Sequence, residues 1–249
     1  MNGVVPWPFI RLAGETASAG MNRDEQKSQA ASYLHYLLLA RPDLNVAQGL
    51  LSSDNTVIFY FGIGGEGIWQ FEVEWKDREF NKLLYAFIYR LYEPRDFADP
   101  SYIKTEFDKE TTAKYTINIT YQGSEKECRG FYPIYARNPF ATRTHVLSNP
   151  NFKAEGEVEG DNLTVLKDKF CRVQRCFEEL TILNEYVHKP ERVPGVVMAA
   201  YGEKIKLPPP LFKERCKHRL GLGESGSPFT SIPTLSKVLE TLFDVLEGI

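Results

Sequence analysis

Short segments rich in β-branched and aromatic residues dominate the second half of the sequence, and they restrict the fold to one built around a sheet. Helical spacing of apolar residues predicts one helix among them, over 172–187, and a last helix from Pro233 onward. The expected fold class of these mixed strands and helices is α+β. The expected strands cover 115–121, 130–136, 142–147, 163–167, 196–201 and 216–222.

The first half combines two helical segments with two strand-like ones. Apolar residues recur at helical spacing over 24–41, where Pro42 ends the pattern, and again over 80–92. Alternating runs over 56–61 and 68–75 predict two strands. We expect residues 1–21, which are rich in Gly, Pro, Ser and Ala, to form a flexible tail, and the polar stretch 95–113 to be a loop or boundary. The expected division is an α+β region of unknown role over 22–127 and a second domain over 128–249.

Composition points to an ordinary globular protein inside a cell. Hydrophobic residues make up 43% and charged residues 25% of the chain, and the net charge is -3. This charge excludes the basic footprint of a nucleic-acid-binding protein, and no apolar run reaches membrane-spanning length. We expect a cytoplasmic or nuclear location, with no nucleic acid and no membrane as partner. The cysteines lack the paired spacing of a metal site, so no metal is predicted and all are expected to be reduced: Cys128, Cys171, Cys176 and Cys216.

One strand–helix unit carries side chains suited to phosphate chemistry. The short strand 163–167 ends in Lys167, and the helix that follows places Glu179 one turn before an Ile–Leu pair. Phosphoryl transfer needs a cation on the phosphates, and a carboxylate on a packed helix holds an ammonium there. Strand alternation puts Val165 on the same face as Lys167, where it could line an adenine pocket. The alternative is a lysine at the end of an exposed strand and a solvated glutamate, a common pair in α/β proteins.

From about Cys128 onward the chain resembles the fungal-type protein kinases, a divergent branch of the protein kinases. The resemblance implies a kinase-like small lobe, an antiparallel sheet with a regulatory helix, in which Lys167 contacts the α- and β-phosphates of ATP with its Mg ion. Glu179 is implied as the partner of Lys167, with Glu178 as the competing choice. The stretches that carry it are FYPIYARNPFATRTHVLSNP, LTVLKDKF, RCFEELTIL, VHKPERVPGVV and KHRLGLGESGSPFTSIPTLSKVLETLFDVLEGI; YLHYLLLARPDL and YAFIYRLYEPRDFADPSY resemble the region that precedes the kinase core.

The same resemblance implies the rest of the nucleotide site. Gly221, Leu222 and Gly223 match the hinge whose backbone binds adenine, beside Val165. A protein is the implied substrate or partner, and the exposed apolar surface of a small lobe by itself predicts self-association.

Two departures from the kinase pattern affect what the chain is expected to do. No Asp-Phe-Gly occurs, and the His218–Arg219 pair lies too early to belong to a catalytic loop, so the base and a metal-binding aspartate are missing. This predicts a fragment, a truncated gene product or a degenerate homologue. The turn over 136–144, which should cover the phosphates, has no glycine and contains Pro139; Arg137 or Arg143 would have to supply charge instead. The alternative function is a non-catalytic pseudokinase or protein-interaction module.

A second glycine motif, Gly62-Ile-Gly-Gly-Glu-Gly67, satisfies the dinucleotide-binding pattern GxGxxG. The residues that follow alternate like a strand, whereas the dinucleotide fold requires a helix there. A kinase phosphate loop also lies between strands, but Lys76 downstream falls in a charged stretch. The expectation is therefore a hairpin turn.

Overall fold

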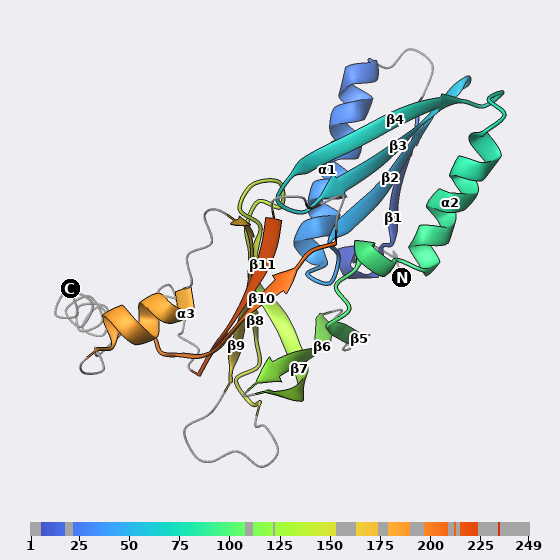
Figure 1. The fold of residues 1–249 in the computed structure, drawn as a ribbon. Coiled ribbons are helices and arrows are strands. Elements are labelled where there is room, and N and C mark those ends of the chain that lie inside the picture. Colours follow the sequence, from blue (N-terminus) through green and yellow to red (C-terminus); the bar gives the residue numbers. More distant parts are fainter. Residues whose placement is uncertain are drawn as a thin grey trace.

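The computed structural model of the 249-residue chain describes residues 6–17, 22–107, 112–121, 123–152, 163–173, 179–189, 197–208, 212, 215–223 and 234. The protein is α+β, as expected, with a four-stranded sheet and a seven-stranded sheet (Figure 1). None of the described helices is long and apolar enough to span a membrane.

The four-stranded sheet contains β1 (Leu12–Thr16), β2 (Val46–Ser52), β3 (Thr56–Ile63) and β4 (Gly67–Glu74), in that order. β1 runs parallel to β2, and the other pairs are antiparallel. The turn between β3 and β4 has positive φ at Gly65 (81°) and Gly67 (143°), which glycine adopts without strain. The GxGxxG motif is therefore the predicted hairpin. The prediction of a flexible tail is wrong for 12–16, which form β1.

Two helices enclose this sheet, and both were predicted. α1 (Arg23–Ala40) begins at Asn22, whose side chain accepts a hydrogen bond from the Asp24 amide at 3.0 Å. α2 (Phe80–Tyr92) places the Phe87 ring 4.9 Å from that of Phe59 on β3. Alternate residues of β3 contact the two helices, so both faces of this strand are buried. A short 3-10 helix, η1 (Trp7–Phe9), precedes β1, and another, η2 (Arg95–Phe97), follows α2.

The seven-stranded sheet is antiparallel throughout, in the order β10-β11-β9-β8-β7-β6-β5. The boundary expected at 127/128 falls inside β7, and β5 and β6 belong to the same sheet as the later strands, so the sheet is not divided there. β5 lies in the stretch expected to be a loop. The strands are β5 (Tyr102–Phe107), β6 (Ala113–Tyr121), β7 (Ser124–Ala136), β8 (Thr144–Ser148), β9 (Val165–Arg172), β10 (Ala199–Lys206) and β11 (Arg215–Leu222).

The helix after β9 is described from residue 179 onward. α3 (Glu179–Thr181) continues as the π-helix η4 (Ile182–Val187), where the His188 amide bonds the Leu183 carbonyl at 3.0 Å. Residue 172, expected to begin this helix, is the last of β9. Residues 174–178, and the last helix expected after Pro233 apart from Thr234, lie outside the described residues.

The seven-stranded sheet curls, so that strands far apart in its order meet across its inner face. The Tyr121 ring on β6 lies 6.0 Å from the Tyr201 ring on β10. Between them lies an apolar core drawn from five strands and their flanks, which includes Tyr115, Phe131 and Leu166. The core lies on the inner face of the curled sheet, and the outer face of β9, β10 and β11 faces α3.

Arg143 joins the two sheets. Its fully buried guanidinium donates hydrogen bonds to the carbonyls of Leu38 (3.0 Å), Arg41 (2.9 Å) and Leu44, at and just beyond the C-terminal end of α1. Helix C-termini leave carbonyls unpaired, and a cation there also complements the helix dipole. Burial lowers the pKa of Arg143 to about 10, and nearby acidic groups offset only part of this shift. Arg143 is therefore a structural link, and the expectation that it serves phosphates is wrong.

Candidate functional site

The two faces of β9 carry different chemistry. Lys167, Lys169 and Cys171 lie on the outer face, and the even-numbered residues lie on the inner face, where Leu166 joins the curled core and Phe170 packs with Val46 and Ile63 of the four-stranded sheet. Lys167 occupies the third position of β9 instead of its end, opposite Leu220 on β11. Cys171 lies opposite Cys216 in the same pair of strands. The outer face therefore presents a row of polar and sulfur-containing side chains toward α3.

Lys167 and Glu179 form the ion pair that the sequence predicts. Lys167 Nζ lies 2.5 Å from Glu179 Oε1, with side-chain exposures of 27% and 37%. α3 is held over the strands by Leu180, which packs on Gly202 of β10: a Cβ added at Gly202 would lie 3.0 Å from Leu180 Cδ2. Because both side chains are partly solvated, the pair contributes about 1 kcal/mol or less to stability. The pairing is thus not explained by a large gain in folding free energy.

A cavity of about 210 Å³ lies beside this pair, between α3 and the outer face of the sheet. Three lysines line it, Lys167, Lys169 and Lys204, together with Glu179 and with Glu203, whose carboxylate pairs with Arg219 at 3.5 Å. His218 and Cys171 lie along the same wall. The excess of cationic side chains over carboxylates makes the cavity suited to an anion.

The other predicted nucleotide-binding residues do not line this cavity. Val165 pairs with Leu222 at one end of the strands, and both lie outside the cavity wall. Gly221 lies inside β11 between Leu166 and Tyr201, and a Cβ there would collide with Leu163. The Leu222 carbonyl accepts the Thr164 amide at 3.0 Å. Of the predicted hinge, Gly223 alone lies beyond the paired strand.

The turn expected to cover the phosphates has other roles in the described structure. Arg143 is committed to α1, and Arg137 is exposed with its amide bonded to the Thr144 carbonyl at 2.9 Å. The Gly65 amide bonds the Pro139 carbonyl at 2.6 Å, so the turn docks on the β3–β4 hairpin. The turn therefore faces the four-stranded sheet.

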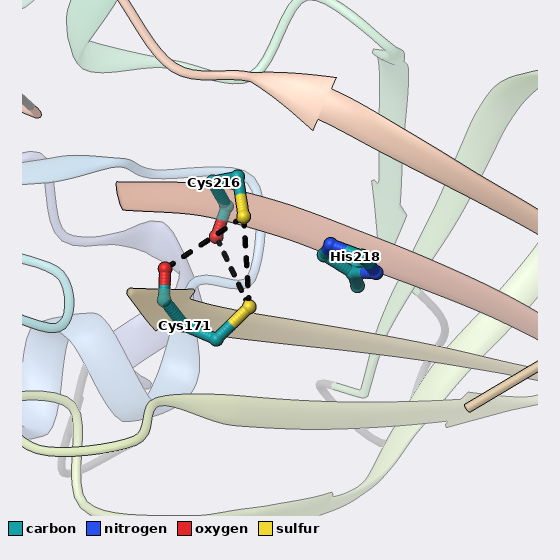
Figure 2. A group of neighbouring side chains, drawn as sticks. All are labelled: Cys171, Cys216 and His218. Carbon is teal, nitrogen blue, oxygen red and sulfur yellow. Dashed lines mark hydrogen bonds between the residues drawn. The ribbon is translucent and has the colours of Figure 1, made fainter. Parts of the chain in front are cut away.

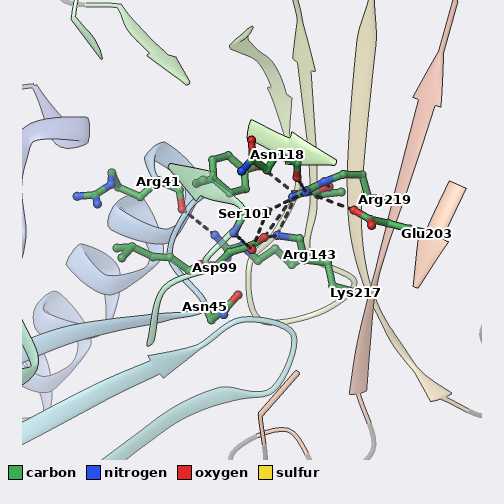
Figure 3. A network of polar contacts seen from close by, with 12 residues as sticks. Arg41, Asn45, Asp99, Ser101, Asn118, Arg143, Glu203, Lys217 and Arg219 are labelled. Carbon is green, nitrogen blue, oxygen red and sulfur yellow. Dashed lines mark hydrogen bonds and ion pairs between the residues drawn. The ribbon is translucent and has the colours of Figure 1, made fainter. Parts of the chain in front are cut away.

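The inner face holds a buried ionic network that the sequence did not predict (Figure 3). Asp168 of β9 accepts from Arg219 at 2.7 and 2.8 Å and pairs with Lys217 at 2.9 Å. Asp99 completes the network, paired with Lys217 and with Arg219 (3.2 Å). All four side chains are at most 2% exposed. Two positive and two negative charges thus meet in the interior, and Arg219 also pairs with the less buried carboxylate of Glu203 on β10 at 3.5 Å.

Neighbouring groups fix the protonation states of this network. Burial by itself would raise the pKa of Asp168, but the adjacent Arg219 and Lys217 charges outweigh it and leave that pKa well below its ordinary value. The pKa of Asp99 is lowered for the same reasons. Burial, together with Asp168, raises the pKa of Tyr102, whose hydroxyl donates to Asp168 at 2.9 Å. Both carboxylates therefore remain ionised in the folded protein at neutral pH.

No family model, curated protein or solved structure matches the chain. The resemblance to fungal-type protein kinases therefore rests on the residues quoted above.

Proposed function

We propose that the chain binds the phosphate groups of ATP, with its magnesium ion, in the cavity beneath α3, and that β7–β11 with α3 are a kinase-like small lobe. The observation that supports this most is the 2.5 Å contact between Lys167 and Glu179 at the cavity wall. The two residues were predicted as a phosphate-positioning pair from a strand and a helix twelve residues apart. A partly solvated pair is worth little to folding, which favours a role in binding.

The cavity fits phosphate better than a whole nucleotide. Its volume of about 210 Å³ is below the roughly 300–1,000 Å³ of sites that enclose drug-sized ligands. The lysines at 167, 169 and 204 place three ammonium groups around it. Val165, predicted to line the adenine pocket, and Leu222 of the predicted hinge lie farther along the same face. We infer that the phosphate chain enters the cavity and that the nucleoside lies outside it.

Lys167 is the residue assigned to hold the phosphates. An ammonium group has three donors, and one of them is directed to Glu179, so two remain for phosphate oxygens. Glu179 fixes the position of the ammonium because Leu180 packs α3 against Gly202. Magnesium keeps several waters in nucleotide sites and enters with the phosphates it bridges. The proposal covers binding; transfer would also need a base and a metal-binding carboxylate in the kinase pattern.

Calorimetry with ATP and magnesium tests the proposal. Lys167→Ala should weaken binding by about 10- to 100-fold, because charged hydrogen bonds contribute about 1.5–3 kcal/mol. Glu179→Gln should weaken it less, since the ammonium remains. Lys82→Ala is the matched control, because Lys82 also pairs with a glutamate (2.9 Å) but on the exposed surface of α2. Equal ATP affinity in the Lys167→Ala and Lys82→Ala variants would refute the assignment.

Inorganic tripolyphosphate separates the two parts of the ligand. If the cavity holds only phosphates, tripolyphosphate should bind nearly as well as ATP, and adenosine should not bind. Strong adenosine binding that survives Lys167→Ala would contradict the proposed placement.

A non-catalytic interaction module is the second candidate function. It is favoured by the turn over 137–143, which docks on the four-stranded sheet and whose Arg143 bonds the end of α1. A folded protein that binds neither ATP nor tripolyphosphate would support this candidate over nucleotide binding.

A further inference from the structure

We propose that Cys171, Cys216 and His218 form a binding site for a thiophilic divalent ion, with Zn²⁺ as the best match. The two cysteines lie directly opposite each other on β9 and β11, and His218 follows two residues later on the same face of β11. Figure 2 shows the two thiol groups directed toward each other and the imidazole farther along the strand of Cys216. The site does not depend on nucleotide binding.

The distance between the two sulfurs is close to that of tetrahedral coordination. The two Sγ atoms are 3.6 Å apart. Two sulfurs at about 2.3 Å from a zinc ion with a tetrahedral angle would be about 3.8 Å apart. One ligand atom from each of the three residues lies within 4.8 Å of the others, so a modest turn of the imidazole brings its nitrogen to the roughly 3.6 Å from sulfur that such an ion requires. A disulfide, by contrast, requires about 2.05 Å.

The charge balance also favours a divalent ion. In the structure each thiol contacts the carbonyl of the opposite cysteine at 3.8 Å, and both cysteines are at most 9% exposed. On binding, each thiol loses one proton to solvent and forms a metal–sulfur bond, while His218 coordinates as neutral imidazole. One divalent cation and two thiolates give a complex with no net charge, so its burial carries little desolvation cost.

Three protein ligands leave one position of a tetrahedral ion open. Cys171 and His218 line the cavity beneath α3, so this position faces the space that Lys167 and Glu179 also reach. Three ligands with an open fourth position are the arrangement of catalytic zinc sites, including Cys₂His sites, whereas structural sites use four. The open position would take water or an oxygen atom of a ligand in the cavity.

Cobalt substitution tests the site in the 249-residue chain, freed of metal with a chelator and kept reduced. Titration with Co²⁺ should give thiolate-to-metal absorption in the near ultraviolet and tetrahedral bands in the visible, saturating at one ion per chain, and Zn²⁺ should displace the cobalt. Cys171→Ser, Cys216→Ser and His218→Ala should each weaken Co²⁺ binding by more than about 100-fold, because loss of second-shell groups alone costs 10- to 100-fold.

Two controls keep the outcome interpretable. Cys128→Ala removes another buried cysteine, in the core of the curled sheet, and should retain the cobalt spectrum. Lys167→Ala should also retain it, so failure of the nucleotide proposal and failure of this one are distinguishable. His218 is only partly buried, so His218→Ala keeps the test decisive even if a cysteine variant unfolds. The inference is overturned by a wild-type chain without thiolate–cobalt absorption, by an unchanged spectrum in His218→Ala, or by a Cys171–Cys216 disulfide that persists under reductant.

Discussion

Asp168→Asn should destabilise the protein more than any exposed charge removal. The four buried charges of Asp99, Asp168, Lys217 and Arg219 sum to zero, and the substitution leaves a net positive charge in a site that is at most 2% exposed. Removal of one partner of a buried ion pair costs about 3–5 kcal/mol, because the remaining charge is desolvated and uncompensated. With a urea dependence of about 3 kcal/mol per molar, the unfolding midpoint should fall by roughly 1 to 1.7 M.

Urea unfolding followed by circular dichroism and by tryptophan fluorescence measures this change. Glu79→Gln is the control: it breaks the exposed pair with Lys82 and should cost no more than about 0.5 kcal/mol. Asp168→Asn combined with Lys217→Met restores neutrality, so the double variant should lose about 1–3 kcal/mol less than the sum of the single variants. If Asp168→Asn shifts the midpoint no more than Glu79→Gln, the network is not a desolvated, balanced set of charges and the reasoning fails.

Three further outcomes follow from single side chains. Burial, reinforced by Arg143, lowers the pKa of His145 to about 3, and its Nε2 donates to the Leu39 carbonyl at 3.2 Å. The folded protein thus keeps His145 neutral, while the unfolded chain takes up a proton below about pH 6.5, so stability is lost as pH falls toward 3. Between pH 7 and 5 this loss is about 2 kcal/mol. His145→Gln should remove that part of the pH dependence of the urea midpoint. The free energy of unfolding should also fall more steeply below about pH 4, where the unfolded chain protonates aspartates whose pKa values are lowered in the fold. Asp168→Asn should reduce this acid-dependent loss of stability. Gly202→Ala should lower the free energy of unfolding by about 1–3 kcal/mol, because the added Cβ overpacks against Leu180. Gly14→Ala is the control: its added Cβ meets only the Leu50 carbonyl at 4.0 Å, so it should be neutral or slightly stabilising. Equal urea midpoints for the two variants would contradict the packing assigned to Gly202.

The elements that were predicted correctly are those whose signal is local. α2 lies at the predicted residues 80–92, and β3, β4 and β6 lie within three residues of the predicted bounds, because helical or alternating periodicity is read within one segment. The Lys167–Glu179 contact could be predicted for the same reason, because it joins a strand to the next helix. Its proposed role in binding phosphate stays a prediction.

The elements that were missed depend on partners distant in the sequence. β1, with the sequence Leu-Ala-Gly-Glu-Thr, has little strand propensity and exists through its pairing with β2. Lys217 and Asp99 are 118 residues apart, and Lys217 points inward from a strand on which charged residues are expected to face solvent. Cys171 and Cys216, 45 residues apart, have no metal-binding spacing in sequence, and only the strand register places them opposite each other.

The buried network and the outer cavity depend on each other through the register of β9 and β11. Asp168 points inward between Lys167 and Lys169, and Lys217 and Arg219 point inward on either side of His218. A slip of β9 by one residue would move Lys167, Asp168 and Lys169 to the opposite face of the sheet. It would expose the paired charges, bury the cavity lysines without carboxylate partners and separate Cys171 from Cys216. The cost of burying an unpaired charge therefore excludes the slipped register, so the inner network determines which side chains line the cavity.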